Sequence, residues 1–402
     1  MIPGSSLLAL LFASNANLKL PLLMLAVFGS AKLLAELFEN VGLPGLVGEI
    51  IAGVFIGPSV LGWVSPNSFL TSLSDLGVMF LLFRVGMEVK SSELIRVGGT
   101  ALIVAASGVV VPFFLGYVIL RALGGPTLEA IFLGASMTAT SVGITAQVLA
   151  SKGFLDQRAS RIILAAAVID DVLGLLVLAV VSSLAKGQIR VLDLVLTAVF
   201  ASGFVVIVAL WGTHMMRRVV PKAAEKLRVS EAEFALATCL LFALGLLAME
   251  TGVAAIVGAF LAGMAIGESV TQRVHVLMHG ATELLVPFFL AGLGLRIDLS
   301  VFRSGSAIAL ALIVLAAALV SKVIGCGIVS LPLGRLEAIK IGVGMMPRGE
   351  VGMVVGQLGL TMGVLSSEVY AVVVFMAIAT TIVAPPFIKL AFQRKPSAVL
   401  IA

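Results

Sequence analysis

Apolar segments long enough to cross a lipid bilayer recur along almost the whole chain, and they constrain the fold more than any other feature. A membrane-spanning helix needs about 20 predominantly apolar residues. No segment shows the apolar–polar alternation of barrel strands, so we predict an all-α polytopic membrane protein with about 13 transmembrane helices. The predicted spans lie at roughly 20–39, 46–62, 73–87, 98–120, 128–150, 160–183, 191–213, 232–251, 254–268, 280–296, 304–330, 336–361 and 367–391.

The composition excludes several other classes of protein. Of the 402 residues, 60% are hydrophobic and 12% are charged, whereas soluble domains carry about 25% charged residues. The net charge of +5 is spread over short loops, which fits membrane orientation and not a nucleic-acid-binding surface. Cys239 and Cys326 both lie in apolar spans, so we expect neither a disulfide framework nor a metal cluster.

The basic residues also predict an orientation. An odd number of spans places the termini on opposite sides, and loops rich in lysine and arginine favour the cytoplasm. With the N-terminus outside, the inner loops hold most of these residues, including Arg217, Arg218 and Lys222. We therefore expect a cytoplasmic C-terminus.

The two halves of the chain carry a repeated sequence. Leu128-Glu129-Ala130-Ile131 returns as Leu336-Glu337-Ala338-Ile339, at an offset of 208 residues (128 to 336). Six spans then fall in each repeat and a seventh lies between them, so the second repeat must be inverted. Inverted repeats are typical of secondary transporters. The predicted units are a first repeat in 1–190, a linking helix and basic loop in 191–230, and a second repeat in 231–402.

Two adjacent acids, Asp170 and Asp171, lie at the centre of an apolar run that extends from about Ile162 to Val181. A single charge at the middle of a membrane helix costs at least about 2.5–3.5 kcal/mol on insertion scales. The alternative is a helix end at the headgroups, but uncharged residues flank the pair on both sides. We predict that the acids form an ion and proton site.

Lys322 lies at mid-span in the other half of the chain. Its repeat-related position is Phe114, and the positions related to Asp170 and Asp171 are uncharged. Each half thus supplies a charge that the other lacks. Snorkelling of the lysine to the interface is the alternative. We predict that the amine and the two acids meet in the protein interior.

The spans at 128–150 and 336–361 each contain a stretch that favours a broken helix. The first is dense in small hydroxylated residues, and the second contains a proline and several glycines. Unwound backbone offers carbonyls to a cation and amides to an anion, although small residues also allow close helix packing. Arg348 and Glu350 could equally be structural or gating residues. The predicted supporting residues are Thr138, Thr140, Ser141, Arg348 and Glu350, with Asp171 and either Thr138 or Thr140 as Na⁺ ligands.

The runs 168–174 and 347–352, together with Ser321-Lys322, resemble the monovalent cation:proton antiporters, in particular NapA-type bacterial sodium/proton antiporters. The resemblance covers nearly the whole chain. It implies the NhaA-like fold with two crossing broken helices, a core site formed by 128–183 with 304–391, and a homodimer in the bacterial inner membrane. It also implies that Asp171 is the main carrier of cation and proton, whereas Asp170 pairs with Lys322 when no cation is bound.

These residues predict a secondary active transporter that exchanges Na⁺ for protons by alternating access, not an enzyme. Burial penalises a charged carboxylate and a nearby ammonium stabilises it, so Asp171 can hold either a proton or a small cation. The acidic doublet implies, through the resemblance, electrogenic exchange and a role in pH homeostasis. We expect no cofactor, no nucleic-acid partner and no soluble nucleotide-binding domain. Alternatives are a K⁺/H⁺ antiporter, a sodium-coupled solute symporter on the same fold and, less favoured, a cation channel or a membrane sensor.

Overall fold

The computed structural model describes residues 16–41, 43–185, 191–227, 230–251, 253–297, 299 and 304–393. Within these ranges the chain is helical and contains no β-strand, which confirms the predicted all-α class. Two compact units are present: the first unit joins residues 1–78 with 280–305, and the second unit joins 79–279 with 306–402. The repeat boundaries predicted from the sequence concern duplication and not compactness, and they stay a prediction.

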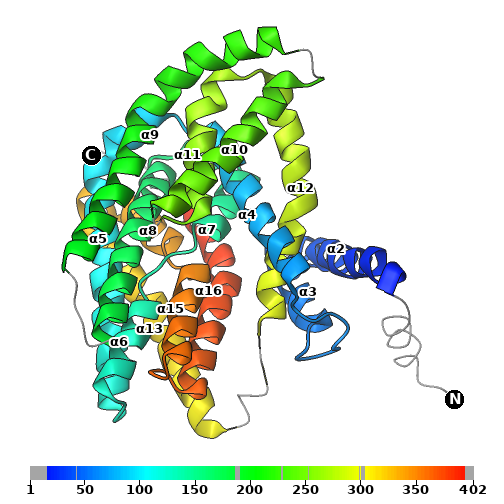
Figure 1. Cartoon of the computed structure of the whole chain (residues 1–402). Coiled ribbons are helices and arrows are strands. Elements are labelled where there is room, and N and C mark those ends of the chain that lie inside the picture. The colour runs from blue at the N-terminus through cyan, green and yellow to red at the C-terminus, as the bar shows by residue number, and fades with distance from the viewer. Residues whose placement is uncertain are drawn as a thin grey trace, which may run out of the picture. The chain divides into compact units, whose positions relative to one another are not determined.

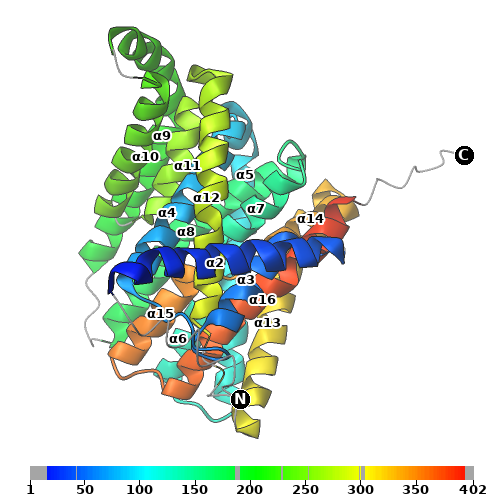
Figure 2. The same ribbon diagram turned by 90° about the vertical axis from the view of Figure 1, so that its right-hand side faces the viewer.

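The first unit contains α2 (Ala16–Asn40), α3 (Gly45–Ile56), the first part of α4 (Ser68–Glu88) and the last part of α12 (Gln272–Leu295). Figure 2 shows α2 beside α3, and the two helices pack closely. A small apolar core that includes Val27, Ala31 and Phe288 holds this unit together. Burial of such side chains contributes about 1.5–3 kcal/mol for each large one.

The second unit contains the remaining helices (Figure 1). Three of them, α9, α10 and α11, pack against one another, and α5 packs along α8. The helices are α5 (Ser91–Ala122), α6 (Thr127–Ser136), α7 (Val142–Ser151), α8 (Arg158–Ala185), α9 (Val191–Lys226), α10 (Ala232–Glu250), α11 (Ala255–Ile266), η1 (Gly267–Ser269), α13 (Gly305–Ser330), η3 (Leu331–Leu333), α14 (Arg335–Gly344), α15 (Glu350–Thr361) and α16 (Ser367–Gln393).

Nine helices in the described ranges are long and apolar enough to cross a membrane by length and composition. Shorter apolar helices lie at 45–56, 127–136, 142–151, 255–269 and 351–361, and the count of 13 spans stays a prediction. Two helices are longer than expected: α9 continues to Lys226 and α12 begins at Gln272. Apolar length sets only the part of a helix inside the hydrocarbon, and polar turns can extend it beyond that part.

The same close backbone approaches occur in both halves of the chain. An added Cβ at Gly48 would collide with the carbonyl of Leu34, and one at Gly258 would collide with the carbonyl of Leu244. The two glycines are 210 positions apart, and so are the two leucines. Only a residue without a side chain permits such an approach, so these equivalent contacts agree with the duplication.

Two predicted spans are each split into two short helices. Residues 137–141 separate α6 from α7, and residues 345–349 separate α14 from α15. In the second break, Pro347 lacks the amide that would continue the helix. The breaks lie against each other, because the amide of Ser141 donates to the carbonyl of Pro347 at 2.8 Å and the hydroxyl of Thr145 donates to Gly344 O at 2.8 Å. The predicted crossing of two broken helices is therefore confirmed.

Candidate ion-binding site

The structure brings Asp170 of α8 and Lys322 of α13 together in the interior of the second unit. Lys322 Nζ lies 3.3 Å from Asp170 Oδ2 and 3.4 Å from Asp170 Oδ1. The lysine side chain is 0% exposed and that of the aspartate is 1% exposed. Because an isolated buried charge is strongly destabilising, each of the two groups compensates the charge of the other.

Asp170 also receives a hydrogen bond from the break between α6 and α7. The backbone amide of Thr140 donates to Asp170 Oδ2 at 2.9 Å. Residue 140 lies just before α7, which begins at Val142, and free amides at a helix N-terminus carry partial positive charge. The carboxylate therefore stabilises both the lysine and the broken end of α7.

Arg348 lies between the broken helices and α13 and is 0% exposed. Its guanidinium donates to the carbonyl of Thr138 at 3.2 Å, to the carbonyl of Ala318 at 2.9 Å and to the hydroxyl of Ser321 at 3.3 Å. Thr138 follows α6, whose free carbonyls carry partial negative charge. Arg348 therefore stabilises the end of α6, whereas Asp170 stabilises the start of α7.

Asp171 is buried next to Asp170 in α8, with 3% of its surface exposed. The hydroxyl of Thr140 is also buried, and it has no hydrogen-bond partner among the described residues. The hydroxyl of Thr138 instead donates to the carbonyl of Ala135 at 2.8 Å. Of the two threonines, Thr140 thus has the hydroxyl that no hydrogen bond holds in place in the described part of the structure.

The predicted supporting residues do not all contribute a side chain to the site as described. Ser141 contributes its backbone amide to the contact with the second break, and the side chain of Glu350 lies outside the described part of the structure. Sequence reasoning missed Thr380 of α16, whose hydroxyl accepts the backbone amide of Arg348 at 3.0 Å. The threonine pair at mid-span in α16 was the available signal, because buried hydroxyls need partners.

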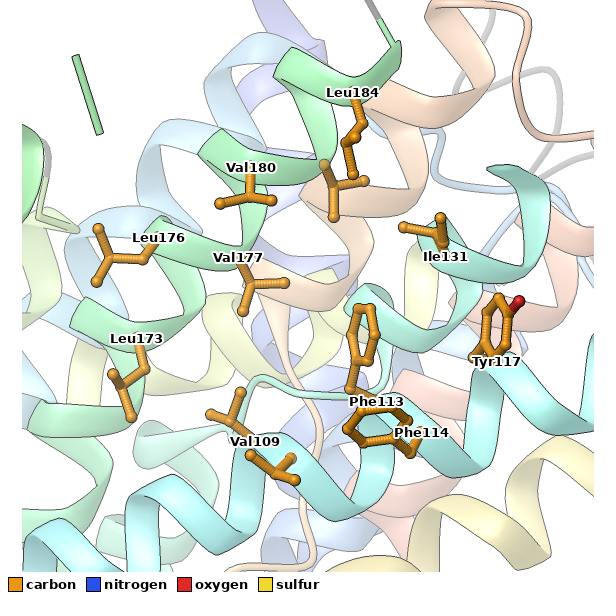
Figure 3. Close-up of a pocket in the computed structure, with 12 residues that line it drawn as sticks. Val109, Phe113, Phe114, Tyr117, Ile131, Leu173, Leu176, Val177, Val180 and Leu184 are labelled. Atoms are coloured by element: carbon orange, nitrogen blue, oxygen red, sulfur yellow. The ribbon is translucent and has the colours of Figure 1, made fainter. Parts of the chain in front are cut away.

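A cavity of about 540 Å³ lies among α5, α6 and α8 (Figure 3). Its walls are apolar side chains, including Phe113, Leu173 and Val177, and Tyr117 supplies the only hydroxyl among the lining residues. An ion crossing this space would lose its hydration without gaining ligands. We therefore exclude this cavity as the polar path to Asp171.

Comparisons with known proteins agree with this geometry. The sequence profile described as “Sodium/hydrogen exchanger, transmembrane” matches residues 23–394. The high-affinity Na⁺/H⁺ antiporter NhaS3 of Synechocystis sp. is 34% identical over 414 residues, which cover 92% of this chain and 89% of that protein. The Na⁺/H⁺-K⁺ antiporter GerN of Bacillus cereus is 34% identical over 379 residues, which cover 92% of this chain and 95% of that protein.

A solved structure also matches. The sodium proton antiporter MjNhaP1 of Methanocaldococcus jannaschii aligns with a TM-score of 0.71 at 17% sequence identity, covering 93% of this chain and 97% of that chain. This likeness concerns the fold. The matches over nearly the whole chain identify a multi-pass membrane protein and confirm the resemblance noted from the sequence motifs: the chain belongs to the transmembrane sodium/hydrogen exchanger family.

Proposed function

We propose that the chain is a secondary active transporter that exchanges Na⁺ for protons by alternating access. The observation that carries the proposal is the buried pair of Asp170 and Lys322, placed beside Asp171 and the two crossing breaks. Carboxylates and carbonyls are oxygen ligands, which hard cations prefer. The same oxygens can take a proton instead, so one site can serve both ions.

Exchange follows from mutually exclusive occupancy. A proton or a Na⁺ ion neutralises Asp171, with the hydroxyl of Thr140 as a further ligand of the cation. A bare charge in the membrane interior is costly, so only the loaded site changes its side of access. Protons and Na⁺ therefore move in opposite directions through the same residues.

Lys322 gives the cycle a second proton. When Na⁺ binds, Asp170 turns from the lysine to the cation, and the unpaired ammonium loses its proton because it is then buried without a counter-charge. Two protons would then move against one Na⁺, and the exchange would be electrogenic. The transporter would act as a homodimer in the bacterial inner membrane, with the N-terminus outside and the C-terminus in the cytoplasm.

Potassium is the second candidate cation, because the relative GerN carries both Na⁺ and K⁺ in its name. The candidate ligands in this site are oxygen atoms, which suit either ion. The size and rigidity of the set of ligands around the cation decide between the two ions. A panel of alkali-metal salts separates the two, since a K⁺/H⁺ antiporter would move protons in K⁺ as fast as in Na⁺.

The test is Na⁺-driven proton movement in liposomes that contain the purified protein. We expect Asp171→Asn to abolish it, and Asp156→Asn, which changes an exposed aspartate between α7 and α8, to leave it intact. Normal proton movement in the Asp171→Asn variant would contradict the assignment. Sodium uptake that needs an organic solute and moves no protons would indicate a symporter.

A further inference from the structure

Gly108 of α5 lies directly against the end of the Lys322 side chain. An added Cβ at this glycine would lie 3.1 Å from Lys322 Nζ and 3.0 Å from Cys326 Sγ. Real Cβ atoms rarely come so close to a neighbour. A side chain at position 108 would therefore displace the ammonium, the sulfur or both.

The two helices cannot easily separate to make room, because other contacts hold them together. The hydroxyl of Ser107 donates to the carbonyl of Gly325 at 2.8 Å, and Cys326 Sγ lies 3.6 Å from the carbonyl of Val104. A Cβ at Gly325 would itself lie 3.2 Å from the carbonyl of Ser107. Interiors packed in this way transmit strain, so the atoms that yield are the ends of the Lys322 and Cys326 side chains and not the helix backbones.

We propose that Gly108 is a positioning residue for the Lys322 ammonium: the absence of a side chain at Gly108 leaves the space from which the ammonium reaches Asp170. The two pair distances, 3.3 and 3.4 Å, lie beyond the usual length of about 2.7–2.9 Å for a charge-assisted hydrogen bond. A displacement of a few tenths of an ångström therefore changes the strength of the pair. Position 108 thus sets how firmly the ammonium holds Asp170 and how readily that carboxylate turns to a cation, an inference that depends on the proposed exchange mechanism.

The experiment compares two glycine substitutions in the same helix, measured as the KM for Na⁺ and the maximal rate of Na⁺-driven proton movement in liposomes at one pH. Gly99 of α5 has nothing within 4 Å of an added Cβ, so Gly99→Ala is the matched control. We expect Gly108→Ala to change the KM for Na⁺ by about threefold or more, the value of a weakened hydrogen bond, and Gly99→Ala to leave it unchanged. Identical KM values for both variants and the unmodified protein would overturn the proposal.

A second variant separates the ammonium from simple packing. Cys326→Ala in the Gly108→Ala protein removes the contact with sulfur and keeps the contact with Lys322. We expect the changed KM for Na⁺ to persist, whereas recovery of the original KM would show that Gly108 serves only to accommodate Cys326. The same double variant carries the test if Gly108→Ala alone does not fold. Absence of exchange in the unmodified protein would instead contradict the proposed function.

Discussion

Two lysine–carboxylate pairs, one in each unit, place the same chemical groups in different surroundings. In the first unit, Lys32 Nζ lies 3.0 Å from Glu49 Oε1, and the lysine side chain is 39% exposed. In the second unit, Lys322 Nζ lies 3.3 Å from Asp170 Oδ2, and the lysine side chain is 0% exposed. The longer pair is the more strongly coupled one, because attraction between charges grows as the surroundings become less polar.

The difference also shows what each pair can do. Lys32 has a second acid within reach, since Glu283 Oε2 lies 3.6 Å away, and its side chain also contacts solvent. Lys322 has no such freedom, because loss of its pairing with Asp170 leaves a charge in a dry interior. In the proposed exchange, cation binding at this pair would therefore be coupled to the gain or loss of a proton.

The largest expected effect comes from breaking the buried pair. Lys322→Ala should lower the free energy of unfolding by about 3–5 kcal/mol, since it leaves Asp170 buried without its counter-charge. Denaturant unfolding of the purified protein measures this loss. The double variant Asp170→Asn with Lys322→Met removes both charges and should recover much of it. A single variant as stable as the unmodified protein would contradict the comparison.

The next effect concerns Arg348, which belongs to the same buried region. Arg348→Ala leaves the carbonyl of Thr138 without this donor, at a cost of about 1–3 kcal/mol for an unsatisfied buried group, whereas the carbonyl of Ala318 keeps the hydroxyl of Ser321 as a donor. Arg348→Lys keeps the charge but not the planar set of donors, so its stability should lie between those of Arg348→Ala and the unmodified protein. Thermal unfolding in detergent gives the order of stability of the three proteins. Equal losses of stability for Arg348→Ala and Arg348→Lys would mean that the planar geometry of the guanidinium, and not its charge, stabilises this region.

A smaller effect is expected on the affinity for Na⁺ and not on stability, and it tests whether Thr140 contributes to the site. Thr140→Ala removes the unpartnered hydroxyl but keeps the backbone amide that donates to Asp170. We expect the KM for Na⁺ to rise about two- to tenfold, the value of one hydrogen-bond-like contact. Thr138→Ala is the comparison, because the hydroxyl of Thr138 is held at the end of α6 by its hydrogen bond to the carbonyl of Ala135. Equal KM values for both variants would argue against Thr140 as a ligand.

The smallest effect comes from the exposed pair. Lys32→Ala should change the free energy of unfolding by about 1 kcal/mol or less, as is usual for ion pairs in contact with solvent. Raising the salt concentration should reduce this difference further but should leave the Lys322→Ala effect nearly unchanged. Unfolding curves at two salt concentrations check both statements, and strong screening of the Lys322 effect would mean that water reaches the buried pair.

The charge pattern was sufficient to predict the meeting of Asp170 and Lys322 across a long stretch of sequence. Charges in apolar spans need partners of opposite sign, and each half of the chain supplies a charge of one sign. Pro347 and the glycines around it likewise indicated one helix break, and the dense small hydroxylated residues of the span at 128–150 indicated the other. These predictions succeed because they follow from the cost of burying polar groups, which depends little on structural detail.

Other features of the site had no such signal. The carbonyl of Ala318, a hydrogen-bond acceptor of Arg348, belongs to the backbone and is chemically the same in every residue. The space at Gly108 depends on the exact distance between two helices, whereas glycine in a membrane helix is common. Helix ends in α9 and α12 were misjudged because hydropathy reports the apolar segment and not the whole helix.

The central claim is that a proton and a cation compete for Asp171. The most direct measurement is proton release from the purified protein in weakly buffered detergent solution when NaCl is added, compared with an equal addition of choline chloride. We expect proton release by the unmodified protein and by Asp156→Asn, and none by Asp171→Asn. Sodium binding without proton release, or equal release by Asp171→Asn, would contradict it.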